Sequence, residues 1–228
     1  MRKTGIVVLP LFLAFSMTLV FCLFTQRAHI VTLGIKAGLR GLTGADVDVR
    51  GVSVRVHGPW ARSLEVFIQR IKFKNPRSYR IPTLALVKNV RLTFQTLSFL
   101  TARWEIDEAE AFIQKAAVQM NAGGGNNLES IPALKNPERD KLDKRFFLRR
   151  LHIKYGTLYY LDFSDPAAPR RESKNLKGKA ELFANLRSPD LVIQAPALTL
   201  LKELSRDFGL PKKQIEENVA AHVMEEKT

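Results

Sequence analysis

The N-terminal segment constrains this chain more than any other feature, because the residues from Ile6 to Phe24 carry no charge. At a helical rise of about 1.5 Å per residue, this run spans about 29 Å, close to the hydrocarbon thickness of a bilayer. The pattern therefore predicts a transmembrane anchor over residues 1–27.

Removal of this segment is the alternative interpretation. A cleaved secretory signal has an apolar stretch of only about 7–15 residues and a small-x-small cleavage site. The run here is longer, and residues 24–27 (Phe-Thr-Gln-Arg) offer no such site. Lipid attachment at Cys22 after cleavage is a third possibility, but the bulky Phe21 stands where a small residue is usual. The sequence favours an anchor that is retained.

The charges beside the anchor predict its orientation. Arg2 and Lys3 favour a cytoplasmic N-terminus, although Arg27 on the other flank reduces the asymmetry. The rest of the chain has no second apolar run of anchor length, so it is expected across the membrane. For a bacterium, this means a single-pass inner-membrane protein with its main domain in the periplasm. An organelle inner membrane would impose the same physics.

The net charge indicates the kind of partner. The chain has 36 Lys plus Arg against 22 Asp plus Glu, a formal charge of +14. Such a field attracts phosphate groups, either of nucleic acid or of anionic lipids. Because a domain tethered outside the cytoplasm meets lipid headgroups rather than DNA, the predicted partners are membrane lipids and not nucleic acid. A basic surface that is merely solvated is the alternative.

The pattern of apolar residues predicts a mainly β domain after a short helix. Residues 28–44 have roughly helical spacing and are expected to link the anchor to the domain. From residue 45 the period changes to two, and Gly51 breaks the register between Val47-Val49 and Val52-Val54, as a bulge or tight turn does. The expected antiparallel strands are residues 47–56, 64–73, 85–94, 104–120, 146–155, 158–163, 176–186 and 191–194, with a turn at Gly156 and a loop over 164–171.

The last segment, residues 197–228, predicts a pair of helices. Leu198, Leu201 and Leu204 lie on one helical stripe, and Pro211 begins a second helix. Such a pair covers a sheet face or edge, or alternatively docks a partner.

The sequence has no arrangement of residues that indicates catalysis. Its four histidines have no metal-ligand spacing, and its one cysteine lies within the apolar run. No nucleophile elbow or phosphate-binding glycine loop is present. His152 and Asp162 flank the predicted hairpin and can meet there, but an exposed or satisfied histidine is the favoured interpretation. We expect no enzyme activity, no cofactor and no metal site.

Several short motifs resemble the N-terminal region of AsmA-like envelope proteins, which are related to chorein-type bridge-like lipid transfer proteins. The matching pieces follow an N-terminal anchor and share their order and spacing with the family. They are Leu42-Thr43-Gly44, Ile71 to Tyr79 with Pro82 and Leu84, Asn126 to Ile131, and Leu151 to Ile153 with Gly156 to Asp162. The resemblance covers about two thirds of the chain, but many family members are several times longer.

The resemblance implies a curved, half-open antiparallel β-sheet whose apolar groove holds lipid. It implies an inner-membrane protein that binds lipid or takes part in phospholipid transport and outer-membrane homeostasis. At about 4.8 Å per strand, some eight strands make a groove of about 40 Å, too short to cross a periplasm. The candidates for groove lining are Val66, Ile68, Leu92, Phe94, Phe112 and Ile113, and the candidates for headgroup binding are Arg149, Arg150, Arg170 and Arg171. The alternative is a non-catalytic structural or assembly factor of an envelope complex that docks a protein partner through its C-terminal helices.

Overall fold

The computed structural model describes residues 28–58, 63–95, 104–122, 125–135 and 146–208. The predicted anchor and the second C-terminal helix lie outside these residues. Within the described part of the chain, no helix is both long and apolar enough to cross a membrane.

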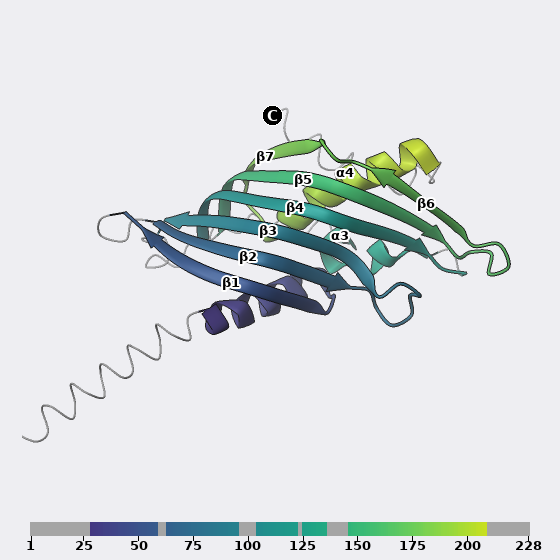
Figure 1. Ribbon diagram of the computed structural model, residues 1–228, viewed down its shortest axis with the longest axis horizontal. Helices are drawn as coiled ribbons and strands as arrows, with labels where there is room; N and C mark the ends of the chain where they lie inside the picture. The colour runs from purple at the N-terminus through teal and green to yellow at the C-terminus, as the bar shows by residue number, and fades with distance from the viewer. Residues whose placement is uncertain (1–27, 59–62, 96–103, 123–124, 136–145, 209–228) are drawn as a thin grey trace, which may run out of the picture.

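The structure is mainly β, as predicted, and is built on one open sheet of seven strands (Figure 1). The strands pair in the order β1-β2-β3-β4-β5-β6, and β7 also pairs with β5. Their bounds are β1 Val47–His57, β2 Ser63–Lys74, β3 Thr83–Gln95, β4 Trp104–Met120, β5 Phe146–Asp162, β6 Arg170–Asn175 and β7 Ala180–Leu186.

The first four strands form the antiparallel meander that their period of two predicts. The next pair is different, because β5 runs parallel to β4 from Trp104↔Phe146 to Met120↔Asp162. The prediction of a wholly antiparallel sheet is therefore wrong at this pair. Between the two strands the chain passes through the 3-10 helix η2 (Asn127–Ser130) and the short helix α3 (Pro132–Lys135). Such a crossover is what a parallel pair requires.

Three other sequence predictions need correction. Gly156 does not make a turn, since β5 continues through it to Asp162. Residues 191–194 are not a strand but belong to the helix α4, Pro189–Phe208, which begins before the predicted residue 197. Strand β6 begins at Arg170, inside the predicted loop.

A bend crosses the first three strands where Gly51 interrupts the alternation. Gly51 and Asn89 have positive φ angles of 66° and 51°. In the register of the sheet, both lie opposite Gln69 of β2, one on each side. In β1 the residues that face the core have odd numbers before this row, Val47 and Val49, and even numbers after it, Val52 and Val54. The irregular backbone at this row therefore shifts the alternation by one residue, so that apolar side chains on both sides of it face the same side of the bent sheet.

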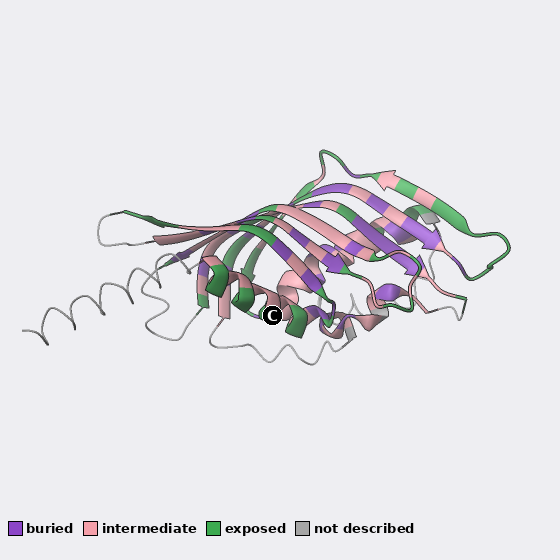
Figure 2. Ribbon diagram, turned by 60° about the horizontal axis from the view of Figure 1, so that its bottom comes forward, coloured by how far each residue is buried: buried purple, intermediate pink, exposed green. Residues whose placement is uncertain are grey.

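All described helices lie on one face of the sheet, which we call the inner face (Figure 2). Residues 28–43 are helical and lie beside β1, while α4 lies across β5 and β7. The hydrophobic core fills the space between these helices and the sheet, with Leu148 and Leu158 of β5 and Leu204 of α4 almost fully buried. The opposite face, which we call the outer face, has no helix of the described part of the chain against it.

A buried amide network joins the two turns that carry motifs of the family resemblance. The Asn127 side chain is fully buried and donates to Asn75 Oδ1 and to the Ala117 carbonyl, both at 2.9 Å. Its Oδ1 accepts from the Gln119 backbone N–H at 2.9 Å. In the same region, Tyr79 donates its hydroxyl to the Asn126 carbonyl at 2.8 Å. These residues therefore hold the β2–β3 turn against the end of β4.

Replacing Asn127 with alanine should lower the free energy of unfolding by about 3 kcal/mol, because it leaves buried donors and acceptors without partners. Urea unfolding of the full chain in mild detergent measures this change. Ser173→Ala on the exposed part of β6 is the control and should change stability by less than about 0.5 kcal/mol. A loss below about 1 kcal/mol for Asn127→Ala would show that the network is not stabilising.

Candidate functional site

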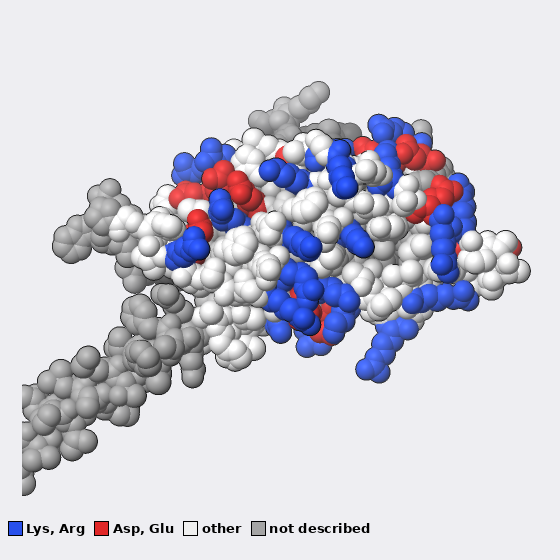
Figure 3. All heavy atoms as spheres, in the orientation of Figure 1, with Lys and Arg blue, Asp and Glu red and all other residues white. Residues whose placement is uncertain are grey.

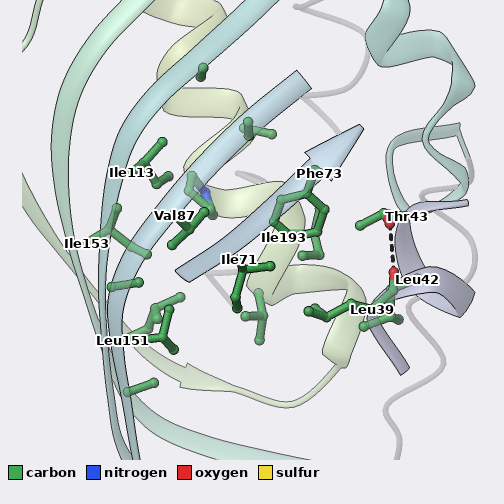
Figure 4. Close-up of a pocket in the computed structure, with 18 of the residues that line it drawn as sticks. Leu39, Leu42, Thr43, Ile71, Phe73, Val87, Ile113, Leu151, Ile153 and Ile193 are labelled. Carbon is green, nitrogen blue, oxygen red and sulfur yellow. Dashed lines mark hydrogen bonds between the residues drawn. The ribbon is translucent and has the colours of Figure 1, made fainter. Parts of the chain in front are cut away.

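The candidate site is an apolar cavity of about 330 Å³ between the inner face of the sheet and the helices. Helix 28–43 supplies Ile35, Leu39 and Leu42 to its wall, and α4 supplies residues from Pro189 to Leu200. In Figure 4, side chains of the sheet and of both helices converge on this space. Those contributed by the sheet and labelled there are Ile71, Phe73, Val87, Ile113, Leu151 and Ile153.

The wall has almost no polar chemistry. Among the described lining residues, the side chains with polar atoms are Thr43 and Glu110. The Thr43 hydroxyl donates to the Leu39 carbonyl at 2.7 Å and is therefore already satisfied (Figure 4). Glu110 is exposed and lies 3.9 Å from Arg91. The cavity thus offers a ligand dispersion contacts and shelter from water. It offers no charged group that could hold a polar ligand.

The sequence reveals part of this wall but not all of it. The helical spacing of Ile35, Leu39 and Leu42 brings all three to the cavity, so that stripe was visible. The first part of α4 was not, because Pro196 disfavours a helix interior and residues 191–194 were predicted as a strand. Ile193, Ala197 and Leu200 line the cavity. Of the predicted stripe, Leu204 is buried in the hydrophobic core and Leu201 packs against it.

The six groove candidates divide between the two faces. Ile68, Leu92 and Ile113 line the cavity. Val66 and Phe94 are buried in the same core but do not border the cavity. Phe112 is only partly buried and lies on the outer face, because neighbouring residues of a strand point to opposite sides and Ile113 points inward. The prediction that Phe112 lines the groove is therefore wrong.

The four headgroup candidates do not form one site. Arg149 and Arg150 lie near the start of β5, 3.8 Å from Asp107 and 3.9 Å from Glu108 respectively. Arg170 and Arg171 lie opposite Asp162 and Leu161 at the far end of the same strand. Arg170 pairs with Glu172, while the Arg171 guanidinium lies 5.9 Å from the centre of the Phe163 ring. Three of the four guanidinium groups are thus engaged by carboxylates.

The possible meeting of His152 and Asp162 does not occur. Both belong to the single strand β5, ten positions apart, which places them at about 33 Å along an extended strand. His152 lies instead 3.2 Å from Glu108. Within the described residues, no cluster of histidine, cysteine and acidic side chains can hold a metal ion.

A cluster of acidic and basic side chains joins the C-terminal half of α4 to the sheet. Glu203 accepts hydrogen bonds from Lys174 of β6 at 2.6 Å and from Lys179 at 2.8 Å. Both bonds lower the pKa of the Glu203 carboxyl, and the bond from Lys174 has the larger effect. Hydrogen bonding raises the pKa of Lys174, through Asp207 and then Glu203, and that of Lys179, through Glu203. We call these four residues the α4 clasp.

A second contact lies farther toward the start of α4. Thr199 of α4 and Tyr155 of β5 both donate to Glu181 Oε2, at 2.6 and 3.0 Å. Burial raises the pKa of the Tyr155 hydroxyl well above its usual range, so it stays a donor at physiological pH. Beyond it, Gln194 donates to the Ala133 carbonyl at 2.7 Å. Polar contacts at three levels therefore hold α4 over the cavity.

The α4 clasp makes the docking of this helix pH-dependent. Because the pKa of Glu203 is lowered by folding, its contribution is present above the unfolded value of about 4.3 and is lost as the pH falls through the folded value. The raised pKa values of Lys174 and Lys179 contribute fully below about 10.4, and this contribution is lost as the pH rises through the folded values. Docking of α4 should be strongest between about pH 5 and 10.

Glu203→Gln should weaken the docking of α4 by about 2 kcal/mol at pH 7, since it removes the charge from hydrogen bonds with Lys174, Lys179 and Arg206. It should also reduce the acid dependence, leaving the part that comes from Asp207, whose pKa is lowered by its hydrogen bond with Lys174. Hydrogen exchange of the α4 amides between pH 4 and 8, corrected for intrinsic rates, measures both effects. Ser205→Ala on the same helix should leave the pH dependence unchanged. An unchanged acid dependence in Glu203→Gln would contradict the role of the clasp.

Comparison with known proteins adds no assignment: the sequence matches no protein-family model, no curated protein and no solved structure at a significant level.

Proposed function

We propose that the cavity binds one apolar chain of a membrane lipid, and that this protein is a lipid-binding relative of the AsmA-like envelope proteins. The observation that carries the proposal is the cavity itself, about 330 Å³ in volume and walled by aliphatic and aromatic side chains. Empty apolar space of this size loses dispersion contacts and is poorly suited to water, so an apolar occupant would stabilise it.

The volume supports a single chain. A protein cavity of about 150 Å³ lined by Leu, Ile and Phe binds benzene, which has six carbons. The cavity here is roughly twice as large, so by the same proportion it accommodates about a dozen carbons. Burial of that many methylene groups contributes about 10 kcal/mol before the losses of association are subtracted. Because a bilayer or micelle also keeps the chain from water, retention during extraction depends on the tighter packing of the chain inside the cavity.

The arrangement of the sheet and helices supports an origin in the bilayer. Helix 28–43 forms one wall of the cavity and follows directly on the segment predicted to be an anchor. An inner-membrane anchor would hold the domain in the periplasm, within reach of the acyl chains that the cavity would take up. In this proposal the bent sheet is a short, half-open groove with α4 across it. The domain shields a chain and leaves transport across an envelope to longer proteins.

Mass spectrometry of the full chain, extracted with mild detergent from its host membrane, tests the proposal. We expect about one chain-bearing lipid per protein, retained through gel filtration and released when the protein unfolds. Detergent micelles without protein, carried through the same column, give the background. Absence of co-purified lipid in repeated preparations would overturn lipid binding and favour a structural or assembly role.

A further inference from the structure

The outer face of the sheet carries two rows of side chains in which cations alternate with apolar groups. In the register of β2 to β5, one row is Arg70, Lys88, Phe112 and Lys154. The neighbouring row contains Lys72, Leu86 and Lys115. These residues point away from the cavity, because their strand neighbours such as Ile71, Val87 and Ile113 line it.

Part of this surface is hollowed. A depression of about 420 Å³ is lined by Arg70, Lys72 and Lys115 together with apolar groups that include Leu86, Tyr159 and Leu161. No carboxylate belongs to its described lining. The centre of the outer face shows Lys and Arg among uncharged atoms (Figure 3). Asp and Glu gather toward its left and right sides, and some lie within the cluster of cations at the lower centre.

The cations of this surface are mostly not neutralised. Within the described part of the chain, Lys72, Lys88, Lys115 and Lys154 take part in no ion pair, and Arg70 approaches one carboxylate, Asp48, at 3.8 Å. Elsewhere on the sheet, by contrast, Arg91 faces both Glu65 and Glu110. We call Arg70, Lys72, Lys88, Lys115 and Lys154 the basic face.

We propose that the basic face lies against the headgroups of an anionic phospholipid bilayer. The cations extend over four strands, about 14 Å from β2 to β5 at the usual strand spacing, which is broader than a single phosphate group. A bilayer surface presents phosphates over such an area and attracts each basic residue near it. Phe112 and Leu86 lie between the cations and can enter the interfacial layer, while lysine stems extend around them.

This inference concerns the face opposite the cavity and does not rest on lipid binding inside it. A bilayer is favoured over an acidic protein because the surface combines free cations with apolar groups. Moreover, the overall charge of +14 adds a long-range attraction to any anionic membrane. An acidic protein partner is the competing occupant, and the experiment distinguishes the two.

Lysine footprinting of the full chain in lipid vesicles tests the proposal. The protein is reconstituted in phosphatidylcholine alone or with one quarter phosphatidylglycerol, and acylation of each lysine is quantified by mass spectrometry. In the anionic vesicles we expect labelling of Lys72, Lys88, Lys115 and Lys154 to fall about threefold and to recover in 0.5 M salt, as the Debye length shortens. Lys177 and Lys202 are exposed elsewhere and serve as internal controls.

A double charge reversal provides the matched variant. Lys88→Glu with Lys115→Glu should abolish the protection of Lys72 and Lys154, whereas Lys177→Glu should leave it intact. Equal labelling in both kinds of vesicle would overturn the proposal. Protection that occurs in native membranes, but not in anionic vesicles that contain no other protein, would also overturn the proposal. It would assign the basic face to an acidic protein partner.

Discussion

Replacing Ala111 with phenylalanine should reduce the lipid bound per protein by at least tenfold while leaving the fold intact. Ala111 of β4 lines the cavity, and its Cβ is an attachment point for a larger side chain directed into that space. A benzene-sized ring requires about 150 Å³ in a comparable apolar cavity, close to half of the 330 Å³ present here. The remaining volume is too small for an extended chain.

Stability separates this result from simple unfolding. Because the new ring fills empty apolar space, the free energy of unfolding measured without lipid should stay the same or rise by about 1 kcal/mol. Ala184→Phe, at an exposed position of β7, is the matched control and should retain its lipid. Full lipid content in Ala111→Phe would show that the chain is held elsewhere.

Replacing Gly156 with alanine should lower the free energy of unfolding by about 4 kcal/mol or more. A Cβ at this position would lie 2.3 Å from the Gln114 carbonyl oxygen of β4, well inside contact distance. The obstacle is backbone, so relief requires separating the parallel strands β4 and β5 at the centre of the sheet. Gly156 therefore permits a close approach of two strands.

A second glycine tests whether this effect is local. Gly38 lies in helix 28–43, and a Cβ there would meet nothing within 4 Å. Gly38→Ala should raise stability by up to about 1 kcal/mol, since glycine is unfavourable inside a helix. Denaturant unfolding of both variants gives the comparison, and a loss below about 1 kcal/mol for Gly156→Ala would contradict the described strand register.

The meander was predictable because its strands have one buried face, which leaves a period of two in the sequence. The parallel pairing of β4 with β5 was not visible in that period, which is the same for both directions. The interval between Met120 and Phe146 does carry a sign of it, because a parallel pair needs a crossover of a dozen residues or more. Gly156 was misread for a related reason, since a close strand approach and a turn both favour glycine.

The candidate site was predictable only in part. Apolar alternation identifies which residues share a face, so Ile68, Leu92 and Ile113 were found. The same rule shows that Phe112 and Ile113 cannot both face inward within a regular strand. What alternation cannot show is how the helices dock, because that depends on contacts between distant segments, such as Glu203 with Lys174 and Lys179.

Photo-crosslinking tests the central claim most directly, because it reports where an apolar chain lies. The probe is palmitic acid with a diazirine near its methyl end, added to membranes that contain the full chain. The account predicts crosslinks on peptides that contain residues 109–113 of β4 and 192–200 of α4, and their loss in Ala111→Phe. Crosslinks confined to residues 6–24, or distributed equally in the wild type and Ala111→Phe, would contradict it.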